Sequence, residues 1–118
     1  MIAIKRVYAE PSEADGFRVL VDRLWPRGIS KERAKLDLWM KDIAPTTELR
    51  KWFGHDLARW PGFVDKYLQE LKTKSEMLAF LAEKGQQGNL TLIFAGRDEE
   101  HNEAVVLQSL LRQNNTAE

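Results

Sequence analysis

The sequence contains no cysteine, and this absence excludes several kinds of chemistry at once. Without thiols the chain can form neither a disulfide nor a thiolate metal site, and it has no cysteine nucleophile. Histidine is also scarce, because only His55 and His101 are present. A metal centre built from His55, Asp56, Asp98 and His101 would have few ligands, so we expect no metal.

An excess of either charge is missing as well. The chain has 18 basic and 18 acidic residues, so no net charge attracts it to nucleic acid or to an anionic membrane. Any anion-binding site must therefore be local. No apolar run approaches the roughly 18 residues of a membrane-spanning helix, and residues 1–6 lack the basic-then-apolar order of a signal peptide. We expect a cytoplasmic protein with no membrane contact.

Several familiar catalytic motifs are absent too. No serine lies in a Gly-x-Ser-x-Gly turn, no glycine-rich loop ends in Gly-Lys-Ser, and no Gly-x-Gly-x-x-Gly follows a strand. These absences disfavour triad hydrolases, P-loop enzymes and dinucleotide-dependent reductases. The sequence thus leaves the cofactor unknown and does not decide whether the protein is an enzyme.

What is present fits a soluble globular chain of one domain. The 118 residues are 43% hydrophobic and 31% charged, which is typical of such proteins. We expect a single α/β domain over residues 1–118, with a frayed tail at 114–118.

Three segments have the pattern of β-strands. Residues 2–8 and 18–24 are rich in apolar and β-branched side chains, and residues 90–95 form a continuous apolar run typical of a central strand covered on both faces. The connection over residues 9–17 is shorter than a usual parallel crossover, so taken alone it favours an antiparallel pairing of the first two strands.

Capping residues and apolar spacing predict the helices between and after these strands. The expected N-terminal residues are Ser30, Thr46 or Thr47, Pro61, Ser75 and Asp98. We expect the first helix to run toward Trp39, the second to carry its apolar face as far as Trp60, and the fourth to end before Gly85. The fold class is therefore α/β, with a small, mostly parallel sheet of three to four strands packed by helices.

Charged and aromatic residues follow the second strand. Asp22, Arg23, Trp25 and Arg27 lie between that strand and the next helix, where ligands bind in open α/β sheets. Arginine binds phosphate or carboxylate groups through a planar fork, and Trp25 would supply a wall of the site. The alternative is structural: Asp22 pairs with an arginine to hold strand ends together, and Trp25 belongs to the core.

A second cluster follows the strand at 90–95. Arg97 would join the other arginines, and His101 and Asn102 would contact a ligand from the first turn of the last helix. If the protein is an enzyme, His101 or Asp98 would supply acid–base chemistry. The alternatives are a capping role for Asp98 and a surface position for His101. His55 lies at a break in a helix, where it faces the cleft or caps backbone.

The whole chain, read in order, resembles the YeaO-like proteins, a bacterial and archaeal branch of a group of domains of unknown function. The resemblance rests on the string Asp-Arg-Leu-Trp-Pro-Arg-Gly at 22–28 and on residues 4–8, 47–53, 90–95 and 98–102. It implies a single small α/β domain, and it would make the first two strands parallel, with the crossover reduced to a loop. It implies no particular reaction.

These observations predict a cleft that binds an anionic small molecule, such as a nucleotide or a phosphorylated metabolite. The alternative is a nucleic-acid or protein-binding module that uses the same arginines, although the balanced charge disfavours nucleic acid. A purely structural role for the arginines also stays open, and the oligomeric state is not predicted.

Overall fold

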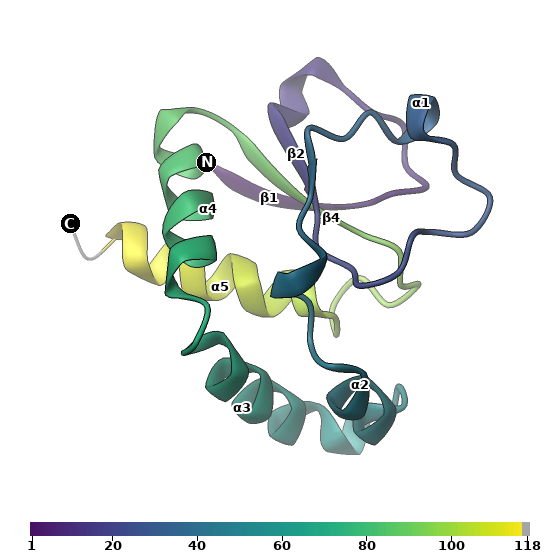
Figure 1. The fold of residues 1–118 in the computed structure, drawn as a ribbon, viewed down its shortest axis with the longest axis vertical. Coiled ribbons are helices and arrows are strands. Elements are labelled where there is room, and N and C mark those ends of the chain that lie inside the picture. The colour runs from purple at the N-terminus through teal and green to yellow at the C-terminus, as the bar shows by residue number, and fades with distance from the viewer. Residues whose placement is uncertain (117–118) are drawn as a thin grey trace.

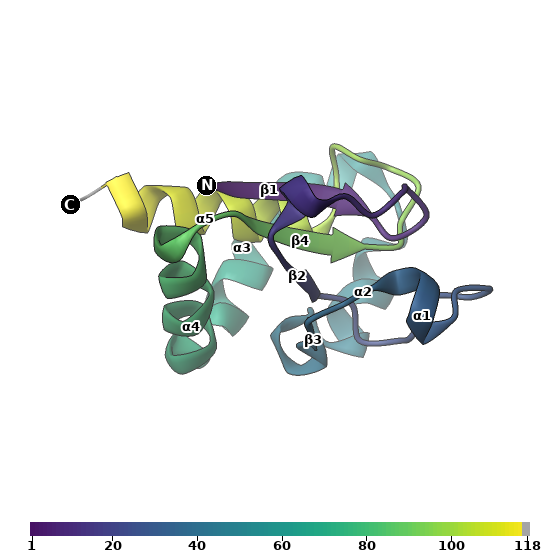
Figure 2. The same ribbon diagram turned by 90° about the horizontal axis from the view of Figure 1, so that it is seen from above.

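A single parallel sheet of four strands organises the structure, a computed structural model that describes residues 1–116 (Figures 1 and 2). The strands are β1 (Ile2–Arg6), β2 (Phe17–Leu20), β3 (Leu38–Trp39) and β4 (Leu90–Phe94), in the spatial order β1-β4-β2-β3. The predicted α/β class and parallel sheet are confirmed. The short strand that sequence reasoning did not place is β3.

The expectation of an antiparallel first pair is wrong, because β1 and β2 are not neighbours. β4 lies between them and pairs in parallel with both. The connection must therefore return along a strand of roughly 17 Å and step sideways by about 10 Å. Residues 7–16 can span about 33–36 Å when extended, so a loop with the short 3-10 helix Glu13–Asp15 is long enough.

β4 is the centre of the sheet, as its continuous apolar run predicts. Each of its residues is buried. Its side chains divide between two hydrophobic clusters, because side chains alternate along a strand. Leu92 and Phe94 pack in the larger cluster beneath the helices, whereas Ile93 packs in the smaller one with Leu20 and Ala34.

Within residues 1–116, five α-helices surround this sheet, and several begin where the sequence predicts. They are α1 (Lys31–Ala34), α2 (Thr47–Phe53), α3 (Trp60–Leu71), α4 (Ser75–Gln87) and α5 (Glu103–Thr116). The side chains of Ser30 and Thr46 accept backbone N–H groups of α1 and α2, which confirms both caps, and Pro61 lies in the first turn of α3.

Two helices end earlier than expected because the backbone turns left-handed. Lys35 ends α1 with a φ of 47°, so Trp39 lies in β3 and not in a helix. Gly54 and His55 end α2 with φ values of 52° and 59°, so the expected continuation to Trp60 is wrong.

Two predicted caps are also wrong. Ser75 is the first residue of α4 and makes no capping hydrogen bond, and α4 continues past Gly85 to Gln87. Asp98 does not cap α5, because Asn102 takes that role: its Oδ1 accepts the Val105 N–H at 3.1 Å. The helix runs through Thr116, and the remainder of the expected frayed tail, residues 117 and 118, lies outside the described residues.

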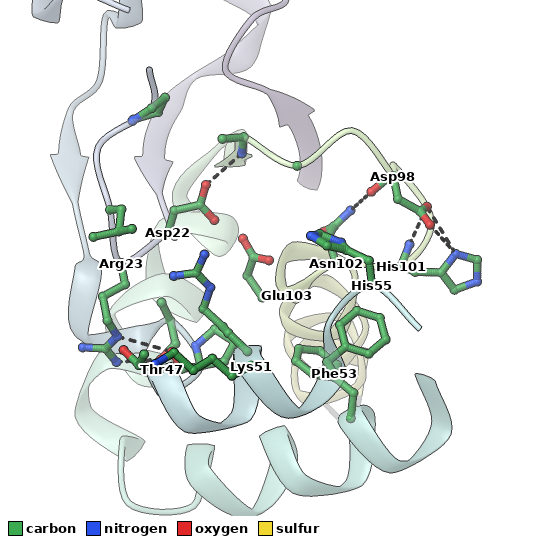
Figure 3. A pocket seen from close by; sticks show the side chains of 18 of the residues that line it. Asp22, Arg23, Thr47, Lys51, Phe53, His55, Asp98, His101, Asn102 and Glu103 are labelled. Carbon is green, nitrogen blue, oxygen red and sulfur yellow. Dashed lines mark hydrogen bonds and ion pairs between the residues drawn. The ribbon is translucent and has the colours of Figure 1, made fainter. Parts of the chain in front are cut away.

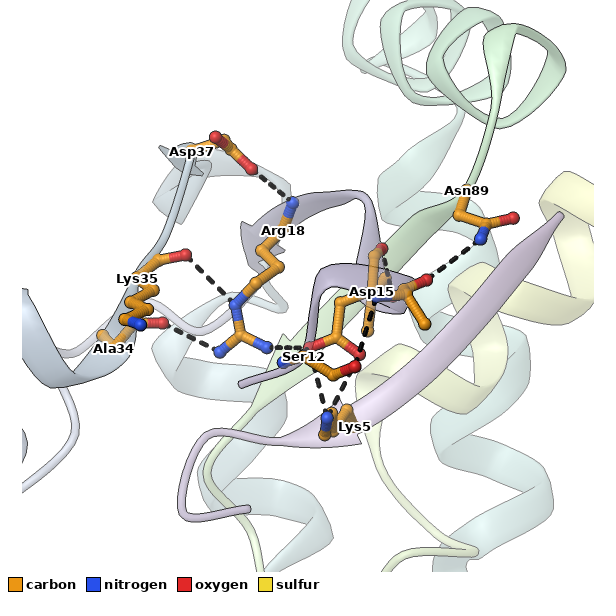
Figure 4. A network of polar contacts seen from close by, with 10 residues as sticks. Lys5, Ser12, Asp15, Arg18, Ala34, Lys35, Asp37 and Asn89 are labelled. Atoms are coloured by element: carbon orange, nitrogen blue, oxygen red, sulfur yellow. Dashed lines mark hydrogen bonds and ion pairs between the residues drawn. The ribbon is translucent and has the colours of Figure 1, made fainter. Parts of the chain in front are cut away.

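A buried ion network supports the sheet next to the β1–β2 connection (Figure 4). Arg18 is 4% exposed and donates to Asp15 Oδ2 at 2.6 Å and to the carbonyls of Ala34 and Lys35 at 2.8 and 3.1 Å. Lys5 Nζ lies 3.1 Å from both Asp15 oxygens. Burial raises the pKa of Asp15, but hydrogen bonds from the Ser12 N–H, Lys5 and Arg18 outweigh it and hold that pKa below its usual value.

We expect Arg18→Ala to lower the free energy of unfolding by about 3 kcal/mol, because it leaves a buried carboxylate and two carbonyls with fewer donors. Urea denaturation followed by circular dichroism measures the loss. Arg33→Ala, an exposed change in α1, is the matched control and should stay within about 0.5 kcal/mol of the wild type. Equal stability of the two variants would contradict a supporting role for the network.

Candidate functional site

Asp22 connects the carboxyl ends of three strands. It follows β2, and its Oδ2 accepts the N–H of Ala95, just past β4, at 2.8 Å. Its carbonyl oxygen accepts the indole N–H of Trp39, at the end of β3, at 2.7 Å. This edge of the sheet is where ligands bind in open α/β folds.

A pocket of about 640 Å³ opens at this edge (Figure 3). Apart from Arg97, every site residue predicted from the sequence lines it. Those residues are Asp22, Arg23, Trp25, Arg27, His55, Asp98, His101 and Asn102. The two sequence clusters therefore come together as predicted, because β2 and β4 are neighbours.

Arg23 holds the pocket wall together and is not free to bind an anion with its whole guanidinium. It donates to the carbonyls of Ala44 and Pro45 at 3.0 and 3.3 Å. Tyr67 donates to the next carbonyl, that of Ile43, at 2.8 Å, and Lys74 donates to the carbonyl of Asp42. Four successive carbonyls before α2 are thus fixed by side chains.

The start of α2 is anchored in the same way, and this anchoring places α2 beside the pocket. Glu70 of α3 accepts both the backbone N–H and the hydroxyl of Thr46, at 3.0 and 2.7 Å. The helix then carries Arg50 and Lys51 to the pocket lining. Sequence reasoning did not include these two residues in the site, because only the tertiary position of α2 brings them to the strand ends.

Arg27, Arg50 and Lys51 form the cationic wall of the pocket. All three are exposed, and none of their side chains makes a hydrogen bond or ion pair with another residue that the structure describes. They differ in this from Arg18 and Arg23, whose N–H groups are used inside the protein.

Asp98, His101 and Asn102 form a turn at the opposite rim. Asp98 accepts the N–H groups of Glu100 and His101 at 2.9 and 3.0 Å, and its Oδ2 lies 3.0 Å from His101 Nδ1. These contacts, the Glu100 N–H first, hold the pKa of Asp98 below its usual value. Asn102 is buried, and its Nδ2 donates to the Asp98 carbonyl.

The imidazole of His101 packs edge-on against Trp60 of α3, with the ring centres 5.1 Å apart. Figure 3 shows it on the far side of Asp98 from Asp22 and Glu103. Both observations place His101 at the rim of the pocket and give it a packing role, so its contact with a ligand stays a prediction.

Glu103, the first residue of α5, is a pocket residue that sequence reasoning missed. Figure 3 shows its carboxyl directed toward that of Asp22. Its Oε1 is buried and has no hydrogen-bond partner among the residues described. Burial, followed by the hydrogen bond with Asp22 and the charge of Asp22, raises the pKa of Glu103 well above its usual value, and the positive charge of Arg50 acts against this rise. The available signal was an acidic residue set between the buried positions Asn102 and Ala104.

Aromatic side chains complete the pocket walls. Trp25 donates its indole N–H to the Ile29 carbonyl at 2.7 Å and meets Trp39 edge-on, with ring centres 5.4 Å apart. It packs against the smaller hydrophobic cluster and also lines the pocket, so it contributes to the core and to the pocket wall. Its contact with a ligand stays a prediction. Phe53 and Phe63, 4.7 Å apart between ring centres, line the pocket beneath α2.

Metal-binding clusters and membrane-spanning helices are both absent from the described residues. No group of three or more His, Asp or Glu side chains is arranged to hold a metal ion. Within the same part of the chain, no helix is both long and apolar enough to cross a membrane.

The fold and the site define a small parallel α/β domain with a pocket at the carboxyl ends of its strands. A family model described as the inactive DUF488-N3 subclade matches residues 1–118, and the chain belongs to this family. This finding agrees with the resemblance to YeaO-like proteins.

Its relatives carry no assigned activity. The chain is 42% identical over 111 residues to the uncharacterised protein YeaO of Escherichia coli (strain K12), covering 94% of this chain and 96% of that protein. It is 39% identical over 110 residues to uncharacterised proteins of Mycobacterium tuberculosis and Mycobacterium bovis, covering 93% of this chain and 92% of each relative. No solved structure matches the chain.

The different partners of Arg23 and Arg27 predict different effects on stability. Arg23→Ala removes two hydrogen bonds from a charged donor and should cost about 2 kcal/mol of unfolding free energy. Arg27→Ala removes a side chain without protein partners and should change stability by less than about 0.5 kcal/mol. Urea denaturation of both variants tests this contrast, and equal losses would contradict it.

The raised pKa of Glu103 predicts a stability cost that grows with pH. Below a pH of about 4.5 both states are protonated, whereas above it the unfolded chain ionises first and unfolding becomes more favourable, by up to about 1.4 kcal/mol per pH unit. The variant Glu103→Gln has no carboxyl to ionise at this position and therefore lacks this pH-dependent cost. Its thermal midpoint should therefore rise relative to the wild type as the pH increases from 5 to 7.

Thermal denaturation at several pH values measures this difference. Glu76→Gln, an exposed change in the first turn of α4, is the matched control. A difference between Glu103→Gln and the wild type that does not change with pH would show that Glu103 ionises normally in the folded protein.

Proposed function

We propose that this protein binds an anionic small molecule, such as a nucleotide or another phosphorylated metabolite, in the pocket at the strand ends. The observation that carries the proposal is the cationic wall of Arg27, Arg50 and Lys51, whose charged groups make no hydrogen bond or ion pair with other described residues. Guanidinium groups bind phosphate through two parallel hydrogen bonds, and lysine adds a mobile positive charge.

The concave shape of the site supports a small ligand. Cationic and aromatic side chains converge on one cavity, and this is typical of sites for small molecules. The balanced overall charge does not favour a nucleic-acid partner. A nucleic-acid or protein partner for the same arginines is therefore an outcome for the experiment to detect.

Binding without turnover fits the family better than catalysis does. The family description calls the subclade inactive, and that description is in keeping with a ligand-binding role here. Acid–base chemistry by His101 or Asp98 would need the imidazole to reach the ligand, and its packing against Trp60 does not favour this.

A thermal-shift screen tests the proposal with nucleotides, sugar phosphates, inorganic phosphate and short oligonucleotides. A ligand present at about 100 times its dissociation constant adds about 2.7 kcal/mol of stability, which raises the melting temperature of such a domain by several degrees. We expect a phosphorylated small molecule to give this shift.

The variant Arg50→Ala should weaken binding of that compound about tenfold or more without lowering the melting temperature of the free protein. Arg33→Ala changes an exposed arginine in α1, which is not among the residues lining the pocket, and is the matched control. Absence of any shift with phosphorylated small molecules would refute the proposal. Oligonucleotide binding that falls steeply with added salt would favour a nucleic-acid partner instead.

A further inference from the structure

The carboxyl pair of Asp22 and Glu103 is the part of the pocket that anion binding does not explain. Acidic groups repel an anion, yet both line the same cavity as the cationic wall. Asp22 has a structural role through its bond to Ala95, and the Glu103 carboxyl is hydrogen-bonded to Asp22 in turn. The Oε1 of Glu103 nevertheless is buried without a partner among the residues described, and such an atom calls for an explanation.

The chemistry of the pair suits a neutral polar group that donates a hydrogen bond. The Glu103 carboxyl is hydrogen-bonded to Asp22, and its Oε1 is left as a buried acceptor without a partner among the residues described. A carboxyl oxygen accepts hydrogen bonds from hydroxyl groups, so an alcohol O–H would satisfy this atom.

The rest of the lining restricts which hydroxyl compound would bind. Arg27, Arg50 and Lys51 supply positive charge in the same pocket, and Phe53 and Phe63 supply apolar surface. A metal ion is a poor occupant of the acidic end, since no group of three or more metal-ligating side chains forms among the described residues and the cationic wall repels it. The lining therefore fits a molecule with a hydroxyl-bearing part and an anionic part.

We propose that Asp22 and Glu103 form a hydroxyl-binding subsite, so that the ligand of this pocket is a phosphate ester of a sugar or another polyol, whether free or as part of a nucleotide. This inference rests on the proposed function, because the phosphate would be held by the cationic wall. Beyond the proposed function, we expect the protein to bind such a compound more tightly than a phosphate ester of the same size that has no hydroxyl groups.

Isothermal titration calorimetry with two matched pairs of probes tests the subsite. One pair is glycerol phosphate and propyl phosphate, and the other is adenosine monophosphate and its dideoxy counterpart. We expect the hydroxylated member of at least one pair to bind about 10–100-fold more tightly, as a hydrogen bond that satisfies a buried, unpaired acceptor implies. The pair that shows the preference identifies the source of the hydroxyl group.

Substitutions of Glu103 then test whether this residue causes the tighter binding of the hydroxylated probe. Glu103→Leu should remove this preference while leaving the affinity for propyl phosphate within about threefold, because propyl phosphate has no hydroxyl group for Glu103 to bind. Glu103→Gln keeps an acceptor oxygen and should keep the preference. Glu76→Leu, an exposed change in α4, is the control.

The possible failures are distinguishable. If none of the probes binds, both the subsite and the proposed function are wrong for phosphate esters. If both members of each pair bind equally, or if Glu103→Leu keeps the preference, only the subsite is overturned. Loss of the preference in Glu103→Gln as well would overturn the role of the Glu103 oxygen as the acceptor of the hydroxyl group.

Discussion

The hydrogen bonds of Asp22 are the constraint on which the rest of the site depends. One carboxylate oxygen holds the start of the loop after β4, and the backbone carbonyl holds Trp39 at the end of β3. These two bonds keep three strand ends level and set the acidic end of the pocket opposite α2. Asp22, a charged residue at a strand end, therefore has a structural role, and the other pocket side chains lie around it.

The basic residues divide into two groups according to their partners. Arg18 and Arg23 match their N–H groups to backbone carbonyls and support the chain around them. Arg27, Arg50 and Lys51 face the pocket with no such partners in the described part of the chain. A guanidinium is costly to bury without acceptors, so the carbonyl-matched residues lie inside and the unmatched ones stay at the surface. The sequence alone does not distinguish these two groups, because both contain arginine and only the folded structure shows which arginines have partners.

Local patterns predicted β1, β2 and β4 and the place of the pocket, but they could not predict what depends on distant contacts. The apolar run of β4 and the rule for strand ends located Asp22 and Asp98 correctly. Asp98 and Asn102 are residue types that cap helix N-termini equally well. Only the path of the loop places Asn102, and not Asp98, at the start of α5. Arg50 and Glu103 escaped notice because their role comes from the docking of α2 and α5. The wrong strand direction arose from the assumption that β1 and β2 pair directly.

The central place of β4 has a consequence for how the chain acquires its fold. The strand that joins β1 to β2 is made only after some ninety residues, so β1 waits for its strand partner from the end of the sequence, and β2 has only the short β3 beside it until then. Such long-range pairing slows folding, because a large loop must close before the contacts form. During synthesis the sheet therefore cannot be completed until β4 leaves the ribosome, and the pocket forms as one of the last features of the molecule.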